Sequence, residues 1–186
     1  MKERPILFNA PMVRALLAGT KTQTRRIGKT QCAEWTELAV EYSIHAKKGK
    51  VAVATHLAYP NGSARHGICE CPYGIPGDRL WVRETFARID GQTRPWIETD
   101  YKATYTHGDR LGDTLGIKKR WTPSIHMPRA ASRITLEVTG VRVERLHACN
   151  EVDAIAEGAP WAACGAPQGG SHKAGFAQLW EQINGD

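Results

Sequence analysis

Apolar residues recur at helical spacing near the start of the chain. Four of them fall on one face of a helix: Met12, Val13, Leu16 and Leu17. Pro11 suits the first turn of such a helix, because its missing N–H would have no partner there. Gly19 can adopt the left-handed conformation that ends a helix. Residues 6–8 form a short apolar run before it, so the pattern predicts a strand followed by a helix.

Period-two alternation predicts several short strands further along the chain. Within residues 79–87, Leu80 and Val82 face one side of the strand, while Trp81 and Arg83 face the other. Gly140 interrupts the last of these patterns, which indicates a bulge or a bend. The predicted strands are residues 51–55, 79–87 and 97–106 and a strand pair within 133–144.

Two helices are predicted in the last third of the chain. Asn150 is a good N-cap for a helix that Gly158 ends, and Glu157 falls in the last turn, where the helix dipole disfavours a carboxylate by ~0.3–1 kcal/mol. A residue placed against local preference is a candidate for function, although an exposed and tolerated acid is the plainer reading. A final amphipathic helix is predicted to pack on the core through Phe176, Leu179, Trp180 and Ile183.

Length and charge narrow the class of protein. The 186 residues suit one domain, and a formal charge of +6 suits a polyanionic partner or a phosphorylated ligand. No apolar run approaches the length of a membrane span, and the N-terminus lacks the features of a signal peptide, so a cytoplasmic protein without a membrane partner is expected. Cys69 and Cys71 are separated by one residue, whereas zinc sites usually space paired cysteines by two to four, so no metal is predicted.

Candidate chemistry gathers directly after the first helix. Lys21 and Thr24 are three residues apart, so in a turn-like segment their side chains can meet. A lysine beside a threonine hydroxyl is a base beside a potential nucleophile. Solvated surface is the plainer reading, because charged residues are mostly exposed.

Three motifs together resemble one family. The spacing Gly19-x-Lys21-x-x-Thr24-x-Arg26 is similar to the signature of ASCH domains, in the PUA-like superfamily, and matches the form found in small bacterial N4-acetylcytidine amidohydrolases. Residues 76–84 and 123–129 resemble a longer, phage- and prophage-encoded branch. The resemblance implies an α+β fold: a small, bent, mostly antiparallel β-barrel with short helices across its mouth. Residues 28–72 would be an insertion, a hairpin or a flap, because the compact members have only a short connection there.

The resemblance implies an amidohydrolase that acts on N4-acetylcytidine or related N4-acylated cytosine nucleosides or bases, with no cofactor. Thr24 would supply the nucleophile or position a water, and Lys21 would be the base, which requires a neutral amine. Burial beside Arg25 or Arg26 would favour that neutral form. Glu157 would move a proton to the leaving amine or orient Lys21, and Arg26 would steady the oxyanion or the cytosine carbonyl.

A pocket for a planar base is a further hypothesis. Its candidate lining residues are Trp81, Arg83, Glu84, Ser124 and His126. The alternatives stay open: the tryptophan could simply cover a sheet, and a single histidine is more often structural than catalytic. The alternative function is an RNA- or modified-base-binding module without hydrolytic activity, which the basic charge also suits, with weak RNA binding as a side property of the enzyme. A nuclease is less well supported, because no acidic pair has metal-binding spacing.

Overall fold

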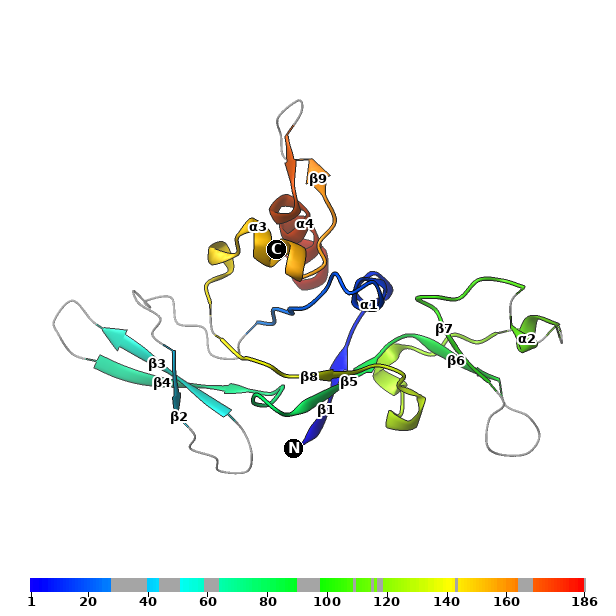
Figure 1. The fold of residues 1–186 in the computed structure, drawn as a ribbon, viewed down its shortest axis with the longest axis horizontal. Coiled ribbons are helices and arrows are strands. Elements are labelled where there is room, and N and C mark those ends of the chain that lie inside the picture. Colours follow the sequence, from blue (N-terminus) through cyan, green and yellow to red (C-terminus); the bar gives the residue numbers. More distant parts are fainter. Residues whose placement is uncertain are drawn as a thin grey trace. The chain divides into compact units, whose positions relative to one another are not determined.

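The computed structural model is mixed α+β, with short helices and several small antiparallel sheets (Figure 1). It describes residues 1–27, 40–43, 51–58, 64–89, 98–108, 110–114, 116, 119–142, 144–163 and 169–185. No closed barrel is found among these residues, so the predicted α+β class is confirmed and the PUA-like barrel is not. In the same residues, no helix has both the length and the apolar character needed to cross a bilayer.

The chain divides into two compact units. The first unit is Met1–Arg4, Arg25–Leu80 and Thr135–Ala148. The second unit is Pro5–Thr24, Trp81–Ile134 and Cys149–Asp186. One three-stranded sheet consists of β1 (Glu3–Leu7), β5 (Arg79–Arg83) and β8 (Thr135–Glu137), in the order β1-β5-β8.

An antiparallel sheet fills much of the first unit. Its strands are β2 (Val40–Ser43), β3 (Val51–Ala58) and β4 (Ala64–Cys71), in the order β2-β3-β4. Val51 pairs with Cys71 and Ala58 with Ala64, so β3 and β4 form the hairpin predicted within 28–72. Cys69 and Cys71 lie in β4 and not in a tight loop, and Cys71 is a free thiol. Residues 59–63, between β3 and β4, lie outside the described residues.

The alternation predicted from residue 79 is confirmed, but the strand is shorter. Leu80 and Val82 are buried, while Trp81 and Arg83 are half-buried. β5 ends at Arg83, and β6 (Phe86–Ile89) pairs instead with β7 (Glu98–Tyr101) in a separate antiparallel sheet. The chain therefore changes its pairing partner after Arg83, which a continuous alternation does not reveal.

Two other strand predictions extend too far. The strand expected over 97–106 ends at Tyr101, because the carbonyl of Tyr101 accepts a bond from the N–H of Thr104 at 3.1 Å and closes a turn. The strand pair expected across Gly140 is wrong: β8 ends at Glu137, and none of the described residues from 138 to 144 lies in a strand. Two short 3-10 helices follow one another later in the chain: η1 (Ser124–His126) and η2 (Arg129–Ala131).

The first predicted helix is α1 (Ala10–Leu17). The side chain of Asn9 caps its start by accepting from the N–H of Met12 at 3.0 Å, and Pro11 lies in the first turn. Gly19 has a φ of 73°, in the left-handed region expected for a residue that ends a helix. Val13 is fully buried, but Leu17 is 52% exposed, so the buried face of α1 is narrower than the apolar pattern of the sequence predicts.

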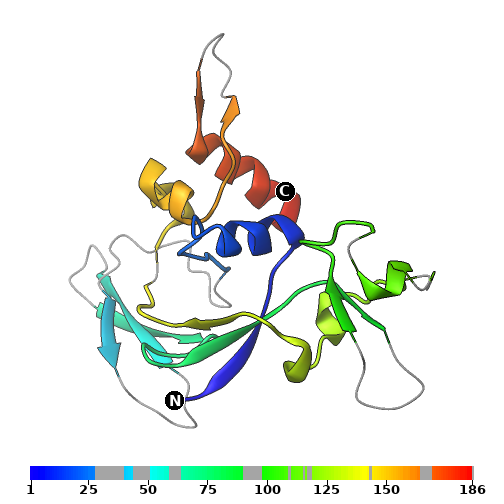
Figure 2. The same ribbon diagram turned by 45° about the vertical axis from the view of Figure 1, so that its right-hand side comes forward.

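Two more helices pack together in the second unit. The elements from residue 149 onward are α3 (Glu151–Ala156), β9 (Ala162–Ala163), β10 (Gly170–Ser171) and α4 (His172–Asn184). Asn150 caps α3 as predicted, in a reciprocal capping box with Asp153. Figures 1 and 2 show α3 and α4 side by side. Their shared core holds Phe176 and half-buried Trp180, but Ile183 is 45% exposed, so its predicted core position is wrong.

A charged network ties β7 to the short helix α2 (Leu111–Thr114). The Nζ of Lys119 lies 2.6 Å from a carboxylate oxygen of Asp100 and 2.9 Å from one of Asp113. The hydroxyl of Tyr105 donates to Asp113 at 2.7 Å. These donors, led by Lys119, lower the pKa of Asp113 from 3.8 to about 2.

This network predicts acid sensitivity. Because the folded pKa of Asp113 lies below the unfolded value, its stabilising contribution is present above pH 3.8 and is lost as the pH falls toward about 2. Asp113→Asn should therefore lower the free energy of urea unfolding at neutral pH, and the difference from the parent should shrink through this window. Glu137→Gln, at an exposed position, is the matched control. A difference between Asp113→Asn and the parent that stays constant with pH would contradict the assignment.

Candidate functional site

Lys21 lies in the irregular segment after α1, and its side chain is almost completely buried. Its Nζ donates to the carbonyl oxygens of Gln23 and Glu157, both at 2.7 Å. It also donates to the carboxylate Oε2 of Glu157 at 2.8 Å. The Phe8 ring centroid lies 5.7 Å from the same nitrogen. The structure thus joins two predicted residues that are 136 positions apart.

Backbone hydrogen bonds hold the end of α1 against the end of α3. The N–H groups of Thr22 and Gln23 donate to the carbonyl of Ala156 at 2.7 and 2.9 Å. Gly158, with a φ of 72°, ends α3 at this contact. A Cβ on Gly158 would lie 2.8 Å from the Cβ of Ala15 and 3.1 Å from that of Lys21. A glycine is therefore required here both by its conformation and by the close approach of the two segments.

The electrostatic partner of Lys21 differs from the one expected. The sequence led us to expect Arg25 or Arg26 beside the Lys21 amine, where it would favour the neutral form. The structure instead places the Glu157 carboxylate beside that amine. A carboxylate oxygen and two carbonyl oxygens therefore accept from Nζ in place of a neighbouring guanidinium. The same contact accounts for Glu157 at the C-cap of α3, because the lysine offsets the unfavourable helix dipole.

The remaining residues of the lysine motif lie close by in sequence. Thr24 is half-buried in the irregular segment that Lys21 opens. Arg25 donates through Nη2 to Glu144 at 2.9 Å within the first unit. Arg26 is also half-buried and belongs to the first unit. Of the predicted catalytic trio, the structure therefore brings Lys21 and Glu157 into direct contact, and the role of Thr24 remains a proposal.

Two of the predicted base-pocket residues, Trp81 and Arg83, lie in contact. The Cζ of Arg83 lies 5.4 Å from the Trp81 ring centroid, on the face of β5 that the two residues share. Arg83 also donates to the carbonyl of Ile125 in η1. Ser124 is half-buried and His126 is exposed on either side of that carbonyl. This Trp81–Arg83 surface combines an aromatic ring with a cation.

Glu84 is engaged elsewhere. It is 2% exposed, and its two carboxylate oxygens accept from Nε and Nη2 of Arg133 at 2.8 and 3.0 Å. The Arg133 guanidinium in turn lies 4.0 Å from the Tyr101 ring centroid. This bidentate pair is a strong geometry, and the sequence analysis did not consider Arg133.

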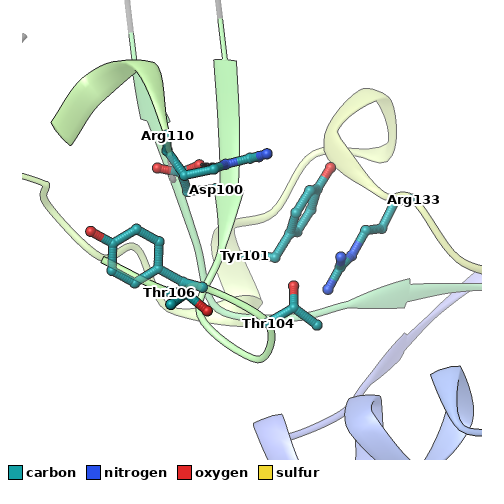
Figure 3. A pocket seen from close by; sticks show the side chains of 7 residues that line it. Asp100, Tyr101, Thr104, Thr106, Arg110 and Arg133 are labelled. Carbon is teal, nitrogen blue, oxygen red and sulfur yellow. Dashed lines mark hydrogen bonds and ion pairs between the residues drawn. The ribbon is translucent and has the colours of Figure 1, made fainter. Parts of the chain in front are cut away.

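A cavity of about 280 Å³ lies beside that pair, within the second unit (Figure 3). Its lining consists of two arginines, two tyrosines, two threonines and one aspartate: Arg110, Arg133, Tyr101, Tyr105, Thr104, Thr106 and Asp100. The sequence does not predict this cavity, because its residues form no motif. The one available signal was the spacing of Tyr101 and Tyr105 within the strand predicted over 97–106.

Comparison of the chain with protein-family models, with curated proteins and with solved structures found no match. Within the described ranges, no group of three or more His, Cys, Asp or Glu side chains is arranged to hold a metal ion.

Proposed function

We propose that the protein is a metal-independent amidohydrolase of the ASCH type, which cleaves the N4-acyl amide of N4-acetylcytidine or of related N4-acylated cytosine nucleosides or bases. One observation carries the proposal: the buried contact of 2.8 Å between Nζ of Lys21 and Oε2 of Glu157. Buried titratable pairs are concentrated at functional sites, although structural ion pairs also occur. The motif Gly19-x-Lys21-x-x-Thr24-x-Arg26 supplies the reaction class by resemblance.

The proposed chemistry starts with a proton transfer within the pair. Nζ of Lys21 passes a proton to Oε2 of Glu157, which leaves a neutral amine as the base. That amine takes the proton from the Thr24 hydroxyl, or from a water that Thr24 positions, as the oxygen attacks the acyl carbon. Arg26 steadies the oxyanion. The C–N bond then breaks, and Glu157 returns its proton to the departing N4 amine.

The products follow from that sequence. If water attacks, the acyl group leaves directly as the carboxylic acid. If Thr24 attacks, an acyl ester forms on its oxygen. Lys21 then passes the proton it took from Thr24 to Glu157, accepts a proton from the water that attacks the ester, and Glu157 returns its proton to the departing Thr24 oxygen. Either route consumes one water and gives one cytidine and one acetate from each N4-acetylcytidine.

The test is incubation of the purified protein with N4-acetylcytidine, followed by chromatography for cytidine and acetate. We expect the two products in equal amounts. Glu144→Gln is the matched control for Glu157→Gln, because Glu144 also pairs with a cation but is only partly buried. Folded parent protein that forms no cytidine would reject the proposed substrate.

Binding to RNA separates this proposal from the alternative of a base-binding module. The charge of +6 should give weak, nonspecific RNA binding that disappears near physiological salt, because neutralised phosphates release counterions that salt restores. The measurement is fluorescence anisotropy with labelled RNAs of unrelated sequence at low and physiological ionic strength. Tight, sequence-dependent binding that survives salt, together with absent hydrolysis, would favour the module.

A further inference from the structure

Two arginines that line the cavity have hydrogen-bond donors that no other described group of the protein engages. Arg133 engages Glu84 through Nε and Nη2, which leaves its Nη1 without a partner among the described residues. Arg110 contacts Asp100 and Glu98 through Nε and donates to the carbonyl of Thr99 through Nη2. Its Nη1 likewise has no partner among the described residues. In each arginine the bonds through Nε and Nη2 fix the planar guanidinium, and with it the orientation of the Nη1 donors.

The two threonines of the lining add further polar groups. Thr104 and Thr106 are exposed, and neither hydroxyl has a hydrogen-bond partner among the described residues. In Figure 3, Thr104 lies below the Tyr101 ring and the Arg133 guanidinium, and Arg110 extends above them. A hydroxyl can donate or accept, so the cavity suits a ligand with several acceptors and at most a few donors.

The charge around the cavity is not that of an anion site. The cations of the network are Arg110, Lys119 and Arg133, and its carboxylates are Glu84, Glu98, Asp100 and Asp113. Four carboxylates against three cations leave one net negative charge. An anionic ligand would add to that negative charge. An uncharged ligand adds none, and its carbonyl oxygens can still accept hydrogen bonds from the guanidinium groups.

The walls are flat and held in place. The hydroxyl of Tyr101 donates to the carbonyl of Ala131 at 2.9 Å, and Arg133 lies over its ring. Lys119 lies 3.9 Å from the Tyr105 ring centroid, and Trp121 contacts that ring edge-on. A volume of about 280 Å³ is just below the range of about 300–1,000 Å³ that is usual for ligand sites. The space therefore suits a single planar ring.

We infer that this cavity is a binding site for a small, uncharged, planar cyclic amide, urea or imide, the ring chemistry of a pyrimidine such as uracil. The carbonyl oxygens of the ring accept from Nη1 of Arg110 and Arg133, and Thr104 and Thr106 contact its edge. Neither Lys21 nor Glu157 lines the cavity, so this inference is independent of the proposed hydrolysis.

The test is calorimetric titration of the full chain with uracil, with uridine and with benzoate. We expect uracil to bind saturably and benzoate, an anionic ring of similar size, to bind more weakly or not at all. Uridine that binds as well as uracil identifies a nucleoside as the source of the ring, and uridine that does not bind identifies the free base. Failure of both to bind, or tighter binding of benzoate, would overturn the inference.

Substitutions at Thr104 locate the site. Thr104→Val should weaken uracil binding about two- to tenfold, the effect of one lost hydrogen bond, and Thr104→Phe should abolish it by filling the cavity. Thr139→Val and Thr139→Phe are matched controls at an exposed threonine of the first unit. Circular dichroism checks folding, and Thr106→Val replaces any variant that does not fold. Uracil binding that is unchanged in these folded Thr104 or Thr106 variants would place the ligand elsewhere.

Discussion

Lys21→Arg should lose nearly all hydrolysis of N4-acetylcytidine, although it keeps the positive charge. The proposed base must release a proton, and a guanidinium does not do so at working pH. The geometry adds a second reason: Nζ meets three oxygen atoms at 2.7, 2.7 and 2.8 Å, an arrangement for a compact ammonium that a planar fork does not reproduce. We expect a reduction of about 10²–10⁴ in kcat, the usual contribution of general acid–base catalysis.

Variants at the two other positions divide the mechanism into its parts. Thr24→Ser should retain activity and Thr24→Ala should not, because only the hydroxyl is needed. Glu157→Gln should also cost about 10²–10⁴ in kcat, since an amide cannot shuttle the proton. Thr22→Ala is the control, because Thr22 is exposed and contacts α3 through its backbone N–H.

The contrary outcomes are equally specific. Near-native turnover in Lys21→Arg would overturn the assignment of Lys21 as the base. Full activity in Thr24→Ala would leave water as the nucleophile and would give Thr24 no part in the chemistry. Each variant must first match the parent in circular dichroism, because Glu157 ends a helix and also contacts Lys21.

Local signals account for what the sequence predicted well. Asn150 caps a helix as predicted, and Gly19 and Gly158 both end helices with positive φ. Each of these features depends on a few neighbouring residues, so a short window of sequence contains the whole cause. Glu157 was predicted as a functional residue for a local reason too, namely its unfavourable position in the helix dipole.

Long-range partners account for what the sequence did not predict. Glu84 was interpreted as pocket lining, but its partner Arg133 lies 49 residues away. The predicted strand 79–87 breaks between β5 and β6 because Phe86 pairs with Tyr101 in the sheet of β6 and β7. Periodicity describes which residues share a face of an element and not which neighbour covers that face, so Leu17 and Ile183 continue an apolar period and are nevertheless exposed.

The second large effect is expected in stability. Lys21→Met should lower the free energy of unfolding by about 3–5 kcal/mol, because it leaves the carboxylate of Glu157 buried without its cation. The carbonyls of Gln23 and Glu157 lose a donor in the same variant. Glu157→Gln should cost less, since the amide oxygen can still accept from Nζ. Urea unfolding of the parent and the variants measures these differences.

The double variant Lys21→Met/Glu157→Leu should be more stable than Lys21→Met alone. Both buried charges are then gone, and the remaining cost is the two carbonyls that lost their donor, about 1–3 kcal/mol for each buried group left unsatisfied. The pair Arg25–Glu144 is the control: its side chains are more exposed, so Glu144→Ala should cost at most about 1 kcal/mol. Equal stability of the double variant and Lys21→Met would contradict a buried ion pair. The double variant could also unfold near the parent's urea midpoint and yet hydrolyse no N4-acetylcytidine. That result would assign the pair to chemistry and not to folding, because the protein would fold without the two charges that the reaction needs.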